Sequence, residues 1–324
     1  MENLLKMATL LAIAGLAAMF NGCNGSKSNE SLTPVISSVK VSNITFTGAT
    51  FTVTILGDGG SPITGQGITI NNVKRYSSEA FGTKTITVSV TDLKSGTDYT
   101  VRGYAQNKVG DGYGDEVKFT TLAETTSDYD GNVYQVLTIG TQKWTKPNFH
   151  GTHYANGDPI TYTTDNVAYG KLTTGAYRWY NDDPKNGQTY GALYNFYTGT
   201  DPRGLIKGFH TPTVLEYKTL VDFLGGYQLA GYAMLEPGTT HWTKTLPNID
   251  NSSGFTVLPA GEFGFDDPSG KWISADMGTS TYFWTTVTVS GFGNTASANS
   301  LNLEFGYGIE CTKDCGLSLR LVAN

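Results

Sequence analysis

Apolar and polar residues alternate along much of the chain before residue 122. In residues 50–55 and 85–90, a large apolar residue stands at every second position, and a threonine or serine fills each position between. This period of two is typical of half-buried strands with one wet face. Clusters of glycine, serine and aspartate, such as residues 57–61, separate these runs at the spacing of an antiparallel sandwich. The pattern therefore predicts an all-β sandwich over residues 34–122.

Residues 93–107, LKSGTDYTVRGYAQN, resemble the tyrosine corner and following strand of a fibronectin type III domain, with Tyr99 as the corner residue. The glycine-rich turn at 110–114 and the closing strand at 117–120 fit the same family. The tryptophan usual in the second strand of that family is absent, and we expect Phe51 to fill its place. The resemblance implies a fibronectin type III-like sandwich that acts as a spacer.

Residues 213–225 carry a helical pattern instead. Thr213 and Glu216 have the spacing of a capping box, and Gly225 is placed to end the helix. One apolar face recurs at helical spacing and consists of Val214, Tyr217, Leu220, Val221 and Leu224. We expect this face to pack in a core. A weaker helical stretch covers residues 229–235, and the rest of 123–324 predicts short strands and loops.

The N-terminus reads as a secretion signal over residues 1–23. Lys6 precedes an apolar run at 7–20, which is shorter than the roughly 20 residues of a transmembrane helix. Cys23 follows a glycine and resembles the acylated cysteine of a bacterial lipobox, although Phe20 stands where that motif usually has leucine. The alternative is an ordinary signal cleaved nearby, which would leave Cys23 as a free thiol.

The polar segment 24–33 is rich in serine, glycine and asparagine and predicts a flexible tether. Together with acylation of Cys23, it predicts attachment to a membrane through an N-terminal lipid anchor. The expected location is the bacterial cell envelope, at the outer membrane or cell surface, with both domains outside the cytoplasm.

Composition agrees with two extracytoplasmic, strand-rich domains. The 324 residues suffice for two domains, 39% of them are hydrophobic, and 40 are glycine. Charged residues make up only 15%, against about 25% in an average soluble domain. The 28 acidic and 22 basic residues give a net charge of −6 without any basic run, so nucleic acid is not an expected partner.

An ordered set of motifs in residues 123–324 resembles the major paralogous domain of Fibrobacter succinogenes, a family of exported bacterial proteins. The motifs are DYDGN at 128–132, VYQVLTIGTQKW at 133–144, YGALYN at 190–195, GFHTPTVLE at 208–216, GFTVLPAG at 254–261, YFW at 282–284 and GLSLR at 316–320. The family is grouped with C-type-lectin-like folds. The resemblance therefore implies a multidomain chain in which the sandwich is followed by an α+β C-type-lectin-like domain.

The cysteines depart from the family pattern. Family members usually carry one cysteine before the segment that contains Phe209 here and another after the terminal arginine, where this chain has residues such as Ile206 and Leu321. The remaining pair, Cys311 and Cys315, is close enough to form a small structural disulfide across a turn. A zinc site would need four ligands, and the sequence offers no second cysteine pair.

The segment 177–187 has the most ligand-like composition, because flat aromatic side chains stand beside oxygen donors suited to a sugar or a calcium ion. The candidate ligand-binding residues are Trp179, Tyr180, Asn181, Asp182 and Asp183, with Trp272 as a second aromatic candidate. Calcium is a possible cofactor at Asn181, Asp182 and Asp183, and no other cofactor is expected. In contrast, Trp144 and Trp284 have strand-like contexts that predict core positions.

No catalytic residues are predicted. The sequence contains no Gly-x-Ser-x-Gly elbow, and its histidines are scattered. Residues 128–132 look calcium-like, but residue 139 is isoleucine where an EF-hand needs an acid, so a hairpin turn is expected.

These observations favour a non-enzymatic surface lipoprotein that binds a glycan or another cell-surface ligand through its C-terminal lectin-like domain. The alternative is a structural or adhesion component that binds protein partners. A third alternative is an enzyme that acts on polysaccharides.

Overall fold

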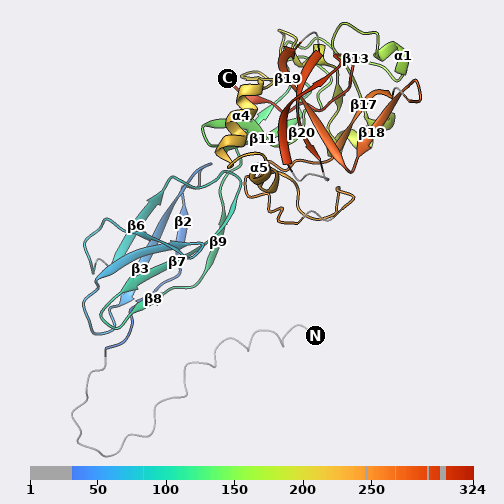
Figure 1. The fold of residues 1–324 in the computed structure, drawn as a ribbon. Coiled ribbons are helices and arrows are strands. Elements are labelled where there is room, and N and C mark those ends of the chain that lie inside the picture. Colours follow the sequence, from blue (N-terminus) through green and yellow to red (C-terminus); the bar gives the residue numbers. More distant parts are fainter. Residues whose placement is uncertain (1–30, 83, 245–246, 267, 290–291, 300–303) are drawn as a thin grey trace, which may run out of the picture.

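The computed structural model describes residues 31–324 except 83, 245–246, 267, 290–291 and 300–303. The predicted signal peptide at 1–23 and most of the predicted tether at 24–33 lie outside the described residues. Figure 1 shows an N-terminal unit made of strands β1 to β9 and a second unit that holds all the described helices. Within the described residues, no helix is both long enough and apolar enough to cross a bilayer.

Two antiparallel sheets form the N-terminal unit. In the first sheet, β3 (Ala49–Gly57) pairs with β1 (Val35–Ile36), β2 (Lys40–Ser42) and β6 (Thr85–Val90). In the second, the order β5-β4-β7-β8 runs through β5 (Val73–Tyr76), β4 (Gly65–Ile70), β7 (Asp98–Gln106) and β8 (Asp111–Tyr113), and β9 (Val117–Thr120) also pairs with β7. Every second residue of β6 is buried, as its period of two predicts.

The sandwich has the fibronectin type III-like features that the sequence predicts. The side-chain hydroxyl of Tyr99 accepts a hydrogen bond from the backbone N–H of Lys94 at 2.8 Å, which is the tyrosine corner. Phe51 is fully buried and meets the ring of Phe119 edge to face, so it occupies the core as expected.

Three further sheets make up the second unit. The first has the order β10-β11-β12-β22-β16, formed by β10 (Thr125–Ser127), β11 (Val133–Ile139), β12 (Gln142–Thr145), β22 (Val322–Ala323) and β16 (Phe209–His210). The second contains β13 (Thr161–Tyr162), β14 (Ala176–Arg178) and β15 (Leu193–Tyr194). The third has the order β18-β17-β19-β20-β21, formed by β18 (Lys271–Met277), β17 (Ala260–Asp266), β19 (Ser280–Val289), β20 (Phe292–Asn299) and β21 (Glu304–Cys311).

The described helices of this unit are short. They are α1 (Asn166–Tyr169), the 3-10 helix η1 (Tyr180–Asp182), α2 (Pro184–Tyr190), α3 (Phe196–Gly199), α4 (Val214–Phe223) and α5 (Tyr227–Met234). The capping box predicted for α4 is present: the Thr213 side chain accepts from the backbone of Glu216, whose own carboxylate accepts from the backbone of Thr213. The predicted helix at 229–235 is α5. Both helices lie against β21, as Figure 1 shows for α4 and α5 beside the third sheet.

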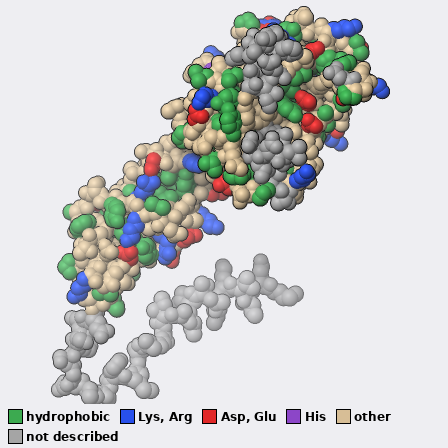
Figure 2. All heavy atoms as spheres, in the orientation of Figure 1, with side chains coloured by type: hydrophobic (Ala, Val, Ile, Leu, Met, Phe, Trp, Pro, Cys, Tyr) green, Lys and Arg blue, Asp and Glu red, His purple; other side chains and the backbone are tan. Residues whose placement is uncertain are grey.

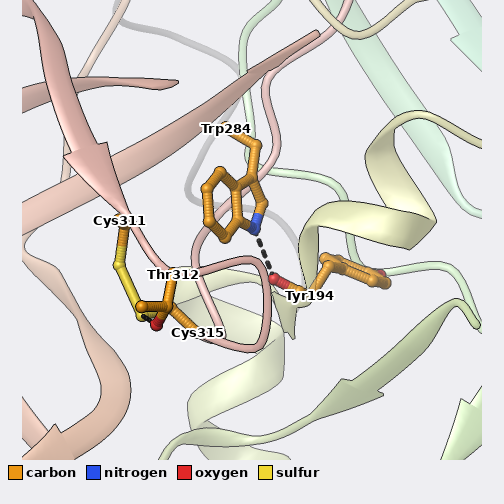
Figure 3. Close-up of a disulfide and its surroundings, with 5 residues drawn as sticks. All are labelled: Tyr194, Trp284, Cys311, Thr312 and Cys315. Atoms are coloured by element: carbon orange, nitrogen blue, oxygen red, sulfur yellow. Dashed lines mark hydrogen bonds between the residues drawn. A yellow bond between two sulfur atoms is a disulfide. The ribbon is translucent and has the colours of Figure 1, made fainter. Parts of the chain in front are cut away.

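Aromatic side chains dominate the core of the second unit. Trp144 and Trp284 are fully buried, as predicted. The indole Nε1 of Trp284 donates to the carbonyl of Tyr194 at 2.6 Å, which ties β19 to β15 (Figure 3). Ile206 and Leu321, which stand at the two positions where the sequence resemblance implies cysteines, are both buried in one apolar cluster. Apolar packing therefore occupies the place of the missing bridge.

The predicted disulfide is present. Cys311 at the end of β21 is bonded to Cys315, and the turn between them includes Thr312, whose hydroxyl lies 3.2 Å from the sulfur of Cys315 (Figure 3). The predicted hairpin turn at 128–132 is also confirmed, since it joins the antiparallel strands β10 and β11.

Candidate functional site

The segment singled out for its composition runs from β14 through η1 into α2, and its backbone reverses sharply. Asn181 and Asp182 both have left-handed backbone angles, with φ of 52° and 57°. Asparagine and aspartate tolerate this conformation better than most residues because their short side chains bond locally. Asp183 then caps α2 by accepting from the backbone of Lys185, and Pro184 occupies the first helical position.

Trp179 lines a hollow of about 510 Å³ on this segment. The other lining residues are Asp130, Asn132, His150, Thr152, Pro184, Gly187 and Gln188. The indole is half-buried and meets Tyr177 edge to face at 5.4 Å. Gly187 lets the helix approach it, because a Cβ at that position would lie 2.3 Å from the ring. The result is a fixed aromatic wall that remains partly open to solvent.

Residues 130, 132, 150 and 152 form a polar part of the lining, and hydrogen bonds hold it in place. Asp130 accepts from the backbone N–H of Thr152, and its carboxylate also contacts the ring of His153. Burial opposes ionisation of Asp130, but these hydrogen bonds outweigh it and lower the pKa of the carboxyl below its usual value. Nδ1 of His150 lies 3.3 Å from the carbonyl of Asn148. The hollow thus combines one flat aromatic face with an ionised acid, an imidazole and amides.

Two of the predicted ligand residues have intramolecular partners instead. Both carboxylate oxygens of Asp182 accept from Nη2 of Arg178, at 2.7 and 2.8 Å, and Asp183 is the cap of α2. The side chain of Asn181 is exposed, and its backbone N–H donates to Ser274. Within the part of the chain that the structure describes, no three His, Cys, Asp or Glu side chains come together to hold a metal.

Tyr180 and Trp272 belong to a different cluster from Trp179. Trp272 stacks on Phe263 with ring centroids 5.5 Å apart, and Tyr180 packs against the same cluster beside Gly261. The structure therefore divides the predicted aromatic set: one ring lines the hollow and two pack around Phe263.

An unusual carboxyl lies close to this second cluster. Glu262 on β17 is largely buried, and burial, aided by the negative charge of Asp276, raises the pKa of its carboxyl to about 7. Asp276 accepts from the hydroxyl of Tyr282 at 3.1 Å.

A second hollow of about 310 Å³ was not anticipated from the sequence. It is lined by Val133, Gln135, Lys146, Pro147, Asn148, Thr189, Thr256, Leu258 and Arg320. Arg320 is buried, and desolvation lowers the pKa of its guanidinium to about 9. The available signal was the arginine of the GLSLR motif, but a lone arginine gives no indication of what surrounds it.

Charge over the rest of the molecule is mixed. On the face drawn in Figure 2, acidic and basic side chains are interspersed over both units, with no continuous basic surface.

Comparison with known proteins identifies one family. The model of the Fibrobacter succinogenes major domain matches residues 137–323. No protein with a curated description matches the chain.

Solved structures share low sequence identity and low TM-scores with this chain. A structure titled "Myokine structure" is 23% identical over 29% of this chain and 99% of that chain, with a TM-score of 0.22. The fibronectin type-III domain of human fibronectin type III domain containing protein 3 is 20% identical over 30% of this chain and 94% of its own, with a TM-score of 0.19. The Yersinia pseudotuberculosis adhesin InvE is 11% identical over 86% of this chain and 71% of its own, with a TM-score of 0.21.

Proposed function

Given that this chain belongs to the Fibrobacter succinogenes major domain family, we propose that it is an exported, non-enzymatic surface lipoprotein that binds a saccharide through its second domain. The binding site of this proposal is the Trp179 hollow, defined by the eight residues that line it. The fibronectin type III-like unit acts as a spacer between this site and a membrane anchor at Cys23.

The observation that carries the proposal is the pairing of a partly open indole with fixed polar groups across one hollow. Sugar rings present apolar C–H faces and a rim of hydroxyls, so they stack on flat aromatic rings and hydrogen-bond to acids and amides beside them. Trp179 supplies the flat face, and the side-chain amide of Gln188 supplies a donor and an acceptor, while Asp130 is hydrogen-bonded to Thr152 and His153 and holds the polar wall in place. The volume of about 510 Å³ lies within the range of roughly 300–1,000 Å³ found for small-ligand pockets.

We also propose that the second domain is C-type-lectin-like and that the protein lies at the outer membrane or cell surface. Three small sheets joined by long loops and short helices support the first of these. The apolar run at 7–20 and Cys23 support the second. Calcium is not required in this proposal, because the carboxylates of Asp182 and Asp183 already have partners within the chain.

A protein-binding role is the second candidate, and one surface favours it. Phe265 on β17 is 50% exposed and Ile273 on β18 is 39% exposed, so the β17–β18 hairpin presents apolar side chains to solvent. Exposed apolar groups of this kind occur at protein-interaction surfaces.

The test is a glycan-array screen of protein lacking residues 1–23, with calcium and with a chelator. Affinity for each hit is then measured for the wild type and for Trp179→Ala. We expect hits that do not depend on calcium and a loss of at least tenfold in the variant, which corresponds to about 1.4 kcal/mol.

Tyr227→Ala is the matched control, since this ring is 45% exposed on α5 and is not among the residues that line the hollow. Thermal unfolding of each variant separates lost binding from lost folding. An array without hits from folded protein, or equal losses in both variants, would refute saccharide binding at Trp179. Binding to a surface protein that is abolished by Phe265→Asp or Ile273→Asp would instead support the protein-partner role.

A further inference from the structure

Arg320 is a buried cation whose described partners are all neutral. Its Nε donates to the amide oxygen of Asn148 at 2.8 Å, and its terminal nitrogens donate to backbone carbonyls, including those of Phe255 at 2.8 Å and Thr256 at 3.1 Å. Within the described residues, no carboxylate lies within ion-pairing distance of it. A buried charge without a counter-charge is costly, so the absence of an acid here requires an explanation.

One N–H of this guanidinium is left over. Arginine has five N–H donors. The structure assigns one from Nε, two from Nη1 to the carbonyls of Thr145 and Phe255, and one from Nη2 to the carbonyl of Thr256. The fifth, on Nη2, has no acceptor among the described residues. Arg320 therefore lines the 310 Å³ hollow with donor capacity to spare.

A second cation lines the same hollow. Lys146 is half-buried, and its ammonium forms no ion pair in the part of the chain that the structure describes. None of the nine lining residues is acidic. The polar groups around the two cations are amides and hydroxyls, such as Gln135 and Thr189, which can complete the solvation of an anion.

Three stretches of chain contribute lining residues both to this hollow and to the Trp179 hollow. Asn132 and Gln188 line the Trp179 hollow, and the residues that follow them, Val133 and Thr189, line the Arg320–Lys146 hollow. Asn148 lines the Arg320–Lys146 hollow, while His150, two residues further along the chain, lines the Trp179 hollow. The two hollows are therefore built from the same three segments of the chain.

We propose that the Arg320–Lys146 hollow binds an anionic substituent, a carboxylate or a sulfate, of the saccharide whose neutral ring stacks on Trp179. This inference rests on the proposed saccharide-binding function and narrows its ligand to acidic glycans. Guanidinium and ammonium groups are the usual donors to carboxylate and sulfate oxygens, and both line this hollow. An anion here would also supply the counter-charge that Arg320 lacks within the chain.

The test compares three oligosaccharides of equal length and backbone: one neutral, one that carries a uronic acid and one that carries a sulfate ester. Calorimetry with protein lacking residues 1–23 measures each affinity at low and high salt. We expect at least one acidic ligand to bind tenfold or more tightly than the neutral one, with the advantage shrinking at high salt. The uronate and sulfate arms identify which anion is preferred.

Lys146→Gln is the test variant and Lys143→Gln its control, because Lys143 is paired with Glu124 and does not line the hollow. We expect Lys146→Gln to reduce the acidic preference about fivefold and Lys143→Gln to leave it unchanged. Because Arg320 variants are at risk of misfolding, Arg320 is followed instead through its side-chain Nε–H signal in an NMR titration with methyl glucuronide, using methyl glucoside as the neutral control.

The outcomes separate the two proposals. Equal affinities for neutral and acidic ligands, with binding still dependent on Trp179, would overturn the acidic specificity and leave saccharide binding in place. If methyl glucuronide shifts the Arg320 signal, methyl glucoside does not, and Trp179→Ala leaves saccharide affinity unchanged, the anion site is supported and saccharide binding at the Trp179 hollow is refuted. No shift and no acidic preference would overturn the inference.

Discussion

Both carboxylate oxygens of Asp182 accept hydrogen bonds from Nη2 of Arg178. The Arg178 side chain is buried, whereas that of Asp182 is partly exposed. The guanidinium also lies 3.7 Å from the centre of the Phe263 ring. Asp182 is thus the described counter-charge of a cation held in the core, which is a structural role that its neighbours in sequence do not reveal.

Asp182→Ala should therefore destabilise the second domain rather than weaken ligand binding alone. Removing one partner of a buried pair leaves an uncompensated charge and typically costs about 3–5 kcal/mol. We expect the lower end of that range, because Asp182 is partly exposed. Urea unfolding measures the effect. Asp183→Ala, which removes only a helix cap, should cost about 1 kcal/mol; a similar loss in both variants would contradict the role given to Asp182.

Gly187→Ala should distort the Trp179 hollow. The added Cβ would lie 2.3 Å from the indole, so the ring must move. Overpacking costs about 1–3 kcal/mol, partly offset by the better helix propensity of alanine. We expect a tenfold or greater loss of saccharide affinity and a small fall in stability. Gly306→Ala on β21 is the control, since nothing lies within 4 Å of its added Cβ. Unchanged affinity in Gly187→Ala would show that the position of Trp179 is unimportant.

Stability should fall as pH rises through neutrality because of Glu262. Its folded-state pKa of about 7 exceeds the ordinary value of 4.5, so between these values the folded state holds a proton that the unfolded state has released. The contribution of protonated Glu262 to folding stability is fully present below pH 4.5 and is lost as the pH rises through 7. Glu262→Gln should therefore be more stable than wild type by about 3 kcal/mol at pH 8, since a pKa raised from 4.5 to about 7 corresponds to about 1.4 kcal/mol per pKa unit.

The Glu262→Gln advantage should vanish near pH 4, which urea unfolding across a pH series would show. The exposed Glu116→Gln serves as the control and should leave the pH profile unchanged. A Glu262→Gln curve parallel to that of the wild type would exclude a raised pKa at this carboxyl.

Reduction of the disulfide should cost about 2 kcal/mol, the chain-entropy estimate for a closed loop of only five residues. The Cys311→Ala/Cys315→Ala double variant should show the same loss without reductant. Because neither cysteine lines the Trp179 hollow, saccharide affinity should persist. Loss of binding on reduction would indicate that the turn at 312–314 supports the site.

Features set by local sequence were predictable. The capping box of Thr213 and Glu216 and the tyrosine corner of Tyr99 depend on residues three to five positions apart, so spacing alone specified them. The buried tryptophans of β12 and β19 were likewise visible as apolar positions in strand-like runs.

The candidate site was only partly predictable, because its contacts join distant segments. Trp179 was recognised by composition, but much of the remaining lining comes from residues 130, 132, 150 and 152, which are far from it in the sequence. Asp182 was interpreted as a ligand because its structural role depends on the burial of Arg178. That burial involves Phe263, which lies 85 positions further along the chain and could not be inferred from the local sequence. Arg320 was missed as a site residue for the same reason, since its partners Asn148 and Phe255 lie 172 and 65 positions away.

The segment 316–322 touches every sheet of the second domain. Gly316 donates to Phe263 of β17, Leu317 exchanges hydrogen bonds with Tyr194 of β15, and Val322 pairs with Trp144 of β12. Such a segment cannot detach without opening three sheets together. The amides of residues 316–318 should then exchange with solvent only when the whole domain unfolds, and the domain should behave as one cooperative unit despite its small, separate sheets.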